Sequence, residues 1–267
     1  MIYIFGSEEF NGLLYGLFEK YRDTAQTKAF IFFLLGILAC VFIPYLLGSL
    51  NASIITSKYM YQDDIRNYGS GNAGLTNMYR IYGKKGAIYT LAGDILKQIL
   101  SVLAGVLVFG INGAFLAGIF CMIGHIFPVF YRFKGGKGVL TAATMILLID
   151  PLVFLVLFSF FVLIVLLFRY ISLASMMAGF IYPALIYYRF KILGGAEAAP
   201  PLPYMLFAVF IGLLIIFMHR ENMRRIYHNE ENRFSFKRKK DEGEEAAEES
   251  SDALASQKKK SKWKKKR

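Results

Sequence analysis

Long apolar stretches recur along the chain of 267 residues, and short polar loops separate them. An α-helix rises about 1.5 Å per residue, so about 20 apolar residues cross the hydrocarbon core of a bilayer. The stretches cover residues 29–50, 86–110, 113–131, 138–150, 151–168, 171–189 and 203–218. The fourth is short for a full crossing and predicts a tilted, thin or partly re-entrant segment. The pattern predicts an all-α integral membrane protein with about seven transmembrane helices, or five or six if the middle segments merge.

Both ends of the chain depart from this apolar pattern. Residues 1–28 carry apolar side chains at helical spacing, namely Phe10, Leu13, Leu14, Leu17, Phe18 and Tyr21. The spacing predicts an amphipathic helix that lies in the membrane interface or packs on the protein's own side. Residues 237–267 run from basic to acidic to basic with almost no apolar side chain, which predicts a disordered tail. The expected organisation is an N-terminal extension over 1–28, a polytopic membrane domain over 29–236 and a charged tail over 237–267.

Composition supports the membrane class and narrows the kinds of partner. Hydrophobic residues make up 56% of the chain and the mean hydropathy is +0.45, which is more apolar than an average soluble domain. The formal net charge is +12, and residues 237–267 alone hold 12 Lys and Arg against 7 Asp and Glu. A basic tail beside membrane segments indicates a membrane-surface tail before a nucleic-acid partner, and a solvated tail with no dedicated role is the alternative. Cys40 and Cys121 lie inside apolar runs with no metal-ligand neighbours, so we expect no disulfide framework and no Cys-based metal site. No metal and no cofactor are expected for the chain.

The distribution of Lys and Arg between the loops predicts the orientation in the membrane. Basic residues gather over 58–85, over 132–137, at Arg169 and in the tail, whereas the turns near Gly110 and Asp150 carry none. Cytoplasmic loops are enriched in Lys and Arg, so the basic loops and the C-terminus are predicted in the cytoplasm and the N-terminus outside. The predicted outer loop after the sixth stretch carries two basic residues and is an exception to the rule.

Three polar clusters interrupt the apolar pattern, and all fall on the predicted cytoplasmic face. The first is RNYGSGNAGLTNMYR, whose glycines allow a tight backbone beside a ligand. Ser70, Asn72 and Thr76 supply hydrogen-bonding groups, and Arg66 and Arg80 supply guanidinium groups that fit phosphate. The cluster predicts a phosphate-binding loop, and a polar connector between two helices is the alternative.

The second cluster, GHIFPVFYRFKGGKGVLT, surrounds Lys137 with glycines. Gly135 and Gly136 would let the ammonium group and nearby N–H groups approach an anion together. The third cluster, HRENMRR, follows the last membrane segment, and its His219 and Asn222 share one face of a helix. The alternatives are a simple basic turn for the second cluster and lipid-anchoring arginines for the third.

Polar residues inside the predicted membrane segments give two weaker candidates. Ser172 and Ser175 lie one turn apart at the start of a segment, although serine in a membrane helix usually bonds to its own backbone. Asp94 and Lys97 are spaced i and i+3, and they predict an internal ion pair near the site because isolated charges are costly there. His125 carries no catalytic prediction from its spacing.

Together the clusters predict a pocket for a phosphorylated molecule at the membrane face. Such a pocket fits an enzyme of lipid synthesis and also a transporter of organic phosphates. A transporter is expected to show internal repeats and broken helices in matching halves, and the sequence shows neither persuasively. Because all three clusters fall on one side, the pattern favours the enzyme.

The motifs GSGNAGLTN, GHIFPVFYRFKGGKGVLT and HREN, in this order, resemble the signature motifs of the bacterial acyl-phosphate:glycerol-3-phosphate acyltransferases, the PlsY family. The resemblance covers about residues 38–236. It implies a seven-helix enzyme of the bacterial cell membrane, with its active site on the cytoplasmic face, that acylates position 1 of glycerol 3-phosphate. The implied donor is acyl phosphate, and the product is lysophosphatidic acid in the first acylation step of phospholipid biosynthesis. The implied partners are both substrates, membrane lipids and the soluble enzyme that makes acyl phosphate.

The resemblance also implies roles for individual residues. The implied catalytic residues are Arg80, Lys137, Ser175, His219 and Asn222. The implied substrate-binding residues are Ser70, Asn72, Thr76, Arg80, Gly135, Gly136, Lys137, Ser175 and Arg220. The general base is either His219 or a substrate phosphate oxygen. Asn229 stands where the family commonly has glycine, and asparagine tolerates a left-handed backbone there.

The histidines agree with an acyl-phosphate donor. None of the three in the chain is followed by Asp five positions later, which is the pair that characterises the unrelated CoA-dependent acyltransferases. The sequence also shows no triad for a nucleophilic Ser or Cys, so direct transfer is predicted over an acyl-enzyme intermediate.

Overall fold

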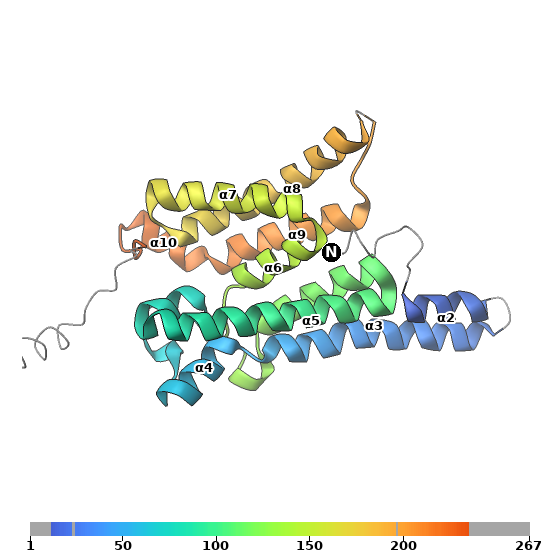
Figure 1. Ribbon diagram of the computed structural model, residues 1–267, viewed down its shortest axis with the longest axis horizontal. Coiled ribbons are helices and arrows are strands. Elements are labelled where there is room, and N and C mark those ends of the chain that lie inside the picture. The colour runs from blue at the N-terminus through green and yellow to red at the C-terminus, as the bar shows by residue number, and fades with distance from the viewer. Residues whose placement is uncertain (1–11, 23–24, 196, 235–267) are drawn as a thin grey trace, which may run out of the picture. The chain divides into compact units, whose positions relative to one another are not determined.

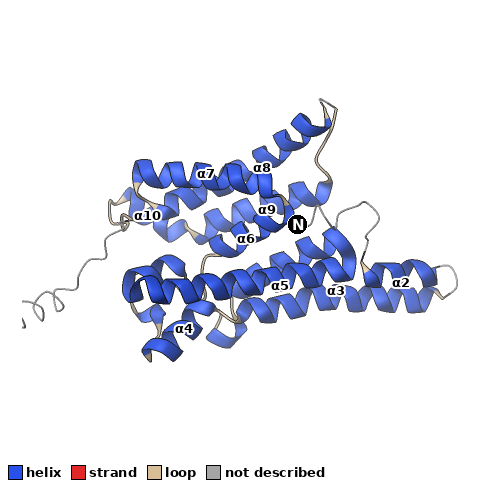
Figure 2. Ribbon diagram, viewed as in Figure 1, coloured by secondary structure: helices blue, strands red, loops and turns tan. Residues whose placement is uncertain are grey.

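The computed structural model describes residues 12–22, 25–195 and 197–234, and these residues form helices, turns and loops without a strand (Figures 1 and 2). The α-helices are α2 (Leu13–Arg22), α3 (Gln26–Ser49), α4 (Ala52–Tyr61), α5 (Leu75–Ile126), α6 (Val139–Ile149), α7 (Pro151–Phe168), α8 (Ile171–Gly194), α9 (Leu202–Met218) and α10 (Arg220–Tyr227). Short 3-10 turns cover Ile65–Asn67 and Val129–Tyr131. The predicted all-α class is confirmed, and the tail over 237–267 lies outside the described residues.

The long helix α5 breaks at Gly83, where φ is 70°, and two antiparallel arms follow this break (Figure 1). Its backbone leaves helical geometry at Gly110, where φ is 57°. A Cβ on Gly105 would lie only 2.1 Å from the carbonyl oxygen of Gly113, and residues eight apart in a straight helix would be about 12 Å apart. The chain therefore reverses at this point. The predicted segments 86–110 and 113–131 correspond to the two arms.

Helix length and composition support a membrane protein. Four helices of the described chain are long and apolar enough to cross a membrane, and the pair α9 and α10, bent by 52°, would make a fifth. Helix α6 has 11 residues and is shorter than a full crossing, as the sequence predicts.

Glycines bring the membrane helices close together. A Cβ on Gly48 of α3 would lie 2.0 Å from the carbonyl oxygen of Cys121 in α5. Helices α8 and α9 approach each other in the same way at Gly179 and Gly212. Small residues favour such contacts because they let two backbones meet without intervening side chains. A buried apolar core then joins α5 to α6, α7, α8 and α9.

The predicted N-terminal amphipathic helix is observed as α2, and it packs on the protein itself. Phe18 lies against Phe33 of α3 with ring centroids 5.7 Å apart, and Tyr21 lies against Phe32 at 5.8 Å. The sequence left open whether this helix lies in the membrane interface or packs on the protein. The ring contacts with α3 support packing on the protein. Phe10, the first residue of the predicted stripe, lies outside the described residues.

Candidate functional site

Side chains from four separate segments form one hydrogen-bonded network. Lys137 Nζ, from the loop before α6, donates to Oδ1 of Asn222 in α10. Asn222 Nδ2 donates to Glu231 Oε1 at 2.6 Å, and Ser172 Oγ at the start of α8 donates to the same oxygen at 2.7 Å. Arg225 Nε donates to Glu231 Oε2 at 2.9 Å. We call these five residues the Lys137–Glu231 network.

Arg80 and His219 lie beside this network. Arg80, half-buried near the start of α5, interacts electrostatically with Glu231 and with Arg225. His219, between α9 and α10, is buried and interacts electrostatically with Lys137 and with Glu231. Arg80, Lys137 and His219 were predicted from motifs far apart in the sequence, and the structure gathers them around one cluster together with Asn222.

The network and Arg80 place one carboxylate among three cationic side chains, so the surroundings carry an excess of positive charge. Burial and the positive charge of Arg225 lower the pKa of Lys137 to about 8, Glu231 opposes this decrease, and Arg80 adds to it. Lys137 is therefore mostly an ammonium at neutral pH, in surroundings that already hold two guanidinium groups. An incoming phosphate would restore the balance of charge, because a cation in a partly buried site gains most from an anionic partner.

His219 is held as a neutral imidazole whose Nδ1 is bonded to the backbone. Its Nδ1 lies 2.8 Å from the carbonyl oxygen of Ile215, so Nδ1 carries the proton and donates it. Burial lowers the pKa of His219 to about 4; the bond to Ile215 and the charge of Glu231 oppose this decrease, and the charge of Lys137 adds to it. At neutral pH, Nε2 therefore carries a lone pair and can accept a hydrogen bond, as it would from a substrate hydroxyl.

Asn77 organises the loop formed by the first polar cluster. It is buried, and its Nδ2 donates to the carbonyl oxygens of Ile65, Tyr68 and Asn72. Its Oδ1 accepts from the N–H of Ser70 at 3.1 Å. Ser70 and Asn72 are thus fixed through their backbone, and the Asn77 amide is used within the loop.

The glycines of this loop adopt the tight backbone that the sequence predicts. Gly69 and Gly71 have φ of 58° and 70°, in the region that favours glycine. After the loop, Thr76 and Arg80 lie four residues apart in α5 and so share one face of the helix.

Arg66 does not serve as a free phosphate ligand, and this part of the sequence interpretation is corrected. Its Nε and Nη2 donate to the Asp64 carboxylate at 2.9 and 2.7 Å, and this pairing lowers the pKa of Asp64. Its Nη1 donates to the carbonyl oxygens of Tyr131 and Lys134 at 2.8 and 3.2 Å. The guanidinium therefore ties the first loop to the loop that carries Lys137.

Gly135 and Gly136 also act differently from the prediction. Their N–H groups, expected to face an anion, donate at 3.1 Å to the carbonyl oxygens of Ile126 and His125 respectively. A Cβ on Gly136 would lie 2.2 Å from Nε2 of His125. The glycines are required here because the loop lies directly on the imidazole, which fixes the backbone just before Lys137.

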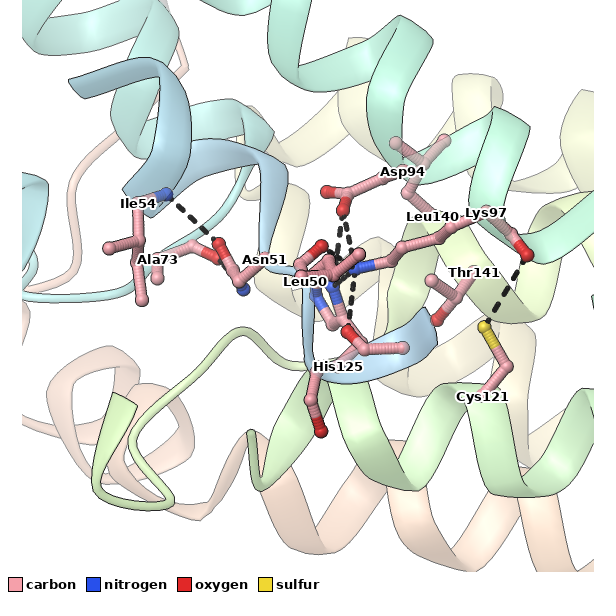
Figure 3. Close-up of polar contacts among 12 residues, drawn as sticks. Leu50, Asn51, Ile54, Ala73, Asp94, Lys97, Cys121, His125, Leu140 and Thr141 are labelled. Atoms are coloured by element: carbon pink, nitrogen blue, oxygen red, sulfur yellow. Dashed lines mark hydrogen bonds and ion pairs between the residues drawn. The ribbon is translucent and has the colours of Figure 1, made fainter. Parts of the chain in front are cut away.

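A buried ion pair between Asp94 and Lys97 lies against His125 (Figure 3). Lys97 Nζ lies 2.8 Å from Asp94 Oδ1, so the predicted internal ion pair is confirmed. The same ammonium lies 3.0 Å from His125 Nδ1 and donates to the carbonyl oxygens of Gly48 and Leu50 at 3.0 and 3.1 Å. His125 Nδ1 also lies 3.4 Å from Asp94 Oδ1, so the imidazole, the ammonium and the carboxylate form one buried cluster.

Ser175 and Arg220, two further predicted site residues, also lie outside the network. Ser175 is buried, and its hydroxyl donates to the carbonyl oxygen of Ile171 at 2.9 Å, the local bond expected for serine in a membrane helix. Arg220 is exposed and lies over the ring of Phe217 at 4.6 Å. Their neighbours in the sequence, Ser172 and Arg225, occupy the network instead.

The sequence interpretation missed Glu231. It contacts Ser172, which lies 59 positions earlier in the chain, and no helical spacing relates the two residues. The available signal was an acidic side chain shortly after a basic motif, which by itself indicates only a solvated surface.

Comparison with known proteins gives consistent matches. Residues 38–229 match the family model described as glycerol-3-phosphate acyltransferase. A protein of this name from Finegoldia magna is 38% identical over 192 residues, which cover 71% of this chain and 91% of the relative. Another from Chlorobium luteolum is 36% identical over 231 residues, covering 76% and 98%. The chain also resembles the crystal structure of PlsY, an integral membrane glycerol 3-phosphate acyltransferase, in its glycerol 3-phosphate form. The two sequences are 37% identical, and the two structures superpose with a TM-score of 0.65. The match covers 74% of this chain and 96% of that chain.

Proposed function

The chain belongs to the glycerol-3-phosphate acyltransferase family of integral membrane proteins, and we propose that it transfers a fatty acyl group from acyl phosphate to position 1 of glycerol 3-phosphate. The products are lysophosphatidic acid and inorganic phosphate, and the reaction is the first acylation step of phospholipid synthesis. Solved PlsY structures hold glycerol 3-phosphate and lysophosphatidic acid, which supports the same substrate and product here. The observation that carries the proposal is the convergence of Arg80, Lys137, His219 and Asn222 on one site.

The chemistry requires positioning more than activation. Acyl phosphate is a mixed anhydride with a good leaving group, so the site must bring two anions together and orient one hydroxyl. Arg80 and Lys137 would hold phosphate groups, because a guanidinium fork and an ammonium both form charge-assisted hydrogen bonds to phosphate oxygens. Nε2 of His219 would accept a hydrogen bond from the glycerol hydroxyl.

The transfer itself can proceed in one step. The hydroxyl oxygen attacks the acyl carbon, the bond from that carbon to the phosphate oxygen breaks, and phosphate leaves with the electron pair. The proton of the hydroxyl then goes to a phosphate oxygen. The low pKa of His219, about 4, supports this route, because a general base works best with a pKa near the working pH.

We place the site at the cytoplasmic face of a bacterial cell membrane. The proposed spans are α3, the two arms of α5, α6, α7, α8 and α9. The basic residues of the polar loops support this orientation, with the N-terminus outside, because cytoplasmic loops are enriched in Lys and Arg. A cytoplasmic site would also face the soluble enzyme that makes acyl phosphate.

Removing residues 237–267 should leave turnover in detergent nearly unchanged. The family match ends at residue 229, and every residue of the Lys137–Glu231 network precedes residue 237. The truncated protein should bind anionic vesicles less well than the full chain, and the difference should disappear at high salt because exposed charges are screened. Steady-state assays and vesicle sedimentation would measure the two effects. A collapse of detergent activity would place the tail inside the catalytic domain.

The choice of donor gives the direct test of the proposed function. Purified protein would receive glycerol 3-phosphate with acyl phosphate, acyl-CoA or acyl-carrier protein, and lysophosphatidic acid would be measured. We expect product from acyl phosphate alone, without added metal or CoA. Full activity with acyl-CoA and none with acyl phosphate would refute the proposed donor.

The transporter alternative predicts a different result. Labelled glycerol 3-phosphate would accumulate inside proteoliposomes that contain the protein and lack any acyl donor. We expect no accumulation above that of empty liposomes.

A further inference from the structure

Glu231 lies at the centre of the network although it follows α10 and stands two residues beyond the region matched to the family model. Its side chain is 9% exposed. One carboxylate oxygen accepts from Ser172 and Asn222, and the other accepts from Arg225. Three donors from two helices therefore converge on this carboxylate.

The carboxylate determines which way the amide of Asn222 points. An asparagine side chain has one acceptor oxygen and one donor nitrogen, which are otherwise free to exchange places. The ammonium of Lys137 only donates and an ionised Glu231 only accepts, so Oδ1 must face Lys137 and Nδ2 must face Glu231, as observed. A neutral side chain at position 231 would remove this distinction, because an amide both donates and accepts.

The backbone around Glu231 is anchored independently of Asn222. The N–H of Phe234 donates to the carbonyl oxygen of Arg169 at 2.6 Å. The N–H of Glu230 donates to the carbonyl oxygen of Arg225 at 2.7 Å. The segment is thus fixed on both sides of Glu231, to the turn before α8 and to α10. The carboxylate can therefore impose an orientation on its partners.

We propose that Glu231 is a positioning residue of the active site, which holds the Asn222 amide so that Oδ1 keeps Lys137 in place for a substrate phosphate. The inference rests on the proposed acyltransferase function. Glu231 acts through Asn222 and Lys137, and its role requires no contact with the substrate.

Glu231 also favours the charged form of Lys137. The charged and titratable groups that face Lys137 are Arg80 from α5, Arg225 from α10, His219 at the start of α10 and Glu231 itself. Of these, the carboxylate of Glu231 raises the pKa of Lys137, whereas the two arginines lower it. Neutralising Glu231 would therefore move the pKa of Lys137 below about 8. Since kcat/KM reports ionisations of the free enzyme, its decline at alkaline pH would begin at a lower pH.

The test compares Glu231→Gln with Glu230→Gln in the full-length protein in detergent. Glu230 is exposed, and in the described part of the chain its side chain makes no hydrogen bond or ion pair, so it is a matched control for the loss of one charge. We expect Glu231→Gln to lower kcat/KM for glycerol 3-phosphate by roughly 10- to 100-fold, as for lost charge-assisted hydrogen bonds, and to move the alkaline decline to lower pH. Glu230→Gln should match the wild type in kcat/KM and in the pH at which the alkaline decline begins. Glu231→Asp keeps the charge, so it should keep the wild-type pH profile and recover part of the activity.

A purely structural role makes a different prediction. It predicts a lower unfolding temperature for Glu231→Gln and a smaller amount of active protein. The alkaline decline of kcat/KM would then begin at the same pH as in the wild type. That result, or wild-type kinetics, would overturn the inference. If Glu231→Gln does not fold, Ser172→Ala removes one hydrogen bond to the carboxylate and leaves its charge. We then expect a loss of several-fold with an unchanged pH profile, and full activity would contradict the inference.

Binding of inorganic phosphate separates this inference from the proposed function. Calorimetry of phosphate binding against pH follows the ionisation of Lys137 without turnover. If the wild type makes no lysophosphatidic acid, the proposed function fails. The pH at which phosphate binding weakens, compared between wild type and Glu231→Gln, still decides whether Glu231 affects the ionisation of Lys137.

Discussion

Replacing Lys137 with alanine should lower kcat/KM for glycerol 3-phosphate by on the order of 10²–10³-fold, the loss typical when one preorganised charge-stabilising donor is removed. Lys137 is partly buried beside Arg80 and Arg225, and its ammonium also holds Oδ1 of Asn222. The substitution therefore removes a phosphate ligand and releases the amide next to it. Steady-state kinetics and thermal unfolding in detergent would measure the effect, and we expect the unfolding temperature to change little because the side chain lies outside the apolar core.

Arg80→Ala should cause a loss of similar size for the same reason. Arg80→Lys should recover little, because lysine lacks the planar fork that binds two phosphate oxygens at once. Lys134→Ala is a suitable control, since Lys134 belongs to the same loop as Lys137 and its side chain is exposed. Wild-type turnover in Lys137→Ala or Arg80→Ala would remove that residue from the site.

The helices were predictable because apolar periodicity and length depend on local sequence. Even the reversal within α5 follows from Gly110, where the sequence marks a boundary between two apolar segments and the backbone takes a φ of 57°. Asn229 gives a similar case, because its φ of 58° confirms that asparagine supports a left-handed turn where the family commonly has glycine.

Side-chain partners across the fold were less predictable. The sequence predicts an anion site at Lys137, since a basic group among glycines indicates anion binding, whereas the role predicted for His219 comes from the family resemblance. It could not show that Arg66 pairs with Asp64, or that the N–H groups of Gly135 and Gly136 are used within the protein. These outcomes depend on which loops meet in three dimensions, and single-sequence patterns carry no information about such contacts.

His219 provides the second large effect and decides where the hydroxyl proton goes. We expect His219→Ala to lower kcat by on the order of 10²-fold, as when a reacting group loses its orientation. His219→Gln should retain a substantial fraction of activity, because its amide oxygen can replace Nε2 as an acceptor.

The pH dependence separates an orienting imidazole from a general base. From the sequence alone, a catalytic His219 predicts a rate that rises through an ionisation near pH 6–7, about the ordinary value for histidine. In the structure the pKa of His219 is about 4, so its neutral form is complete well below neutral pH. The protonated form appears only as the pH falls toward that value, and we therefore expect His219 to add no inflection to kcat/KM between about pH 6 and pH 8. If His219→Gln instead shows little turnover and loses an inflection present in the wild type, the imidazole is the base and the phosphate oxygen is not.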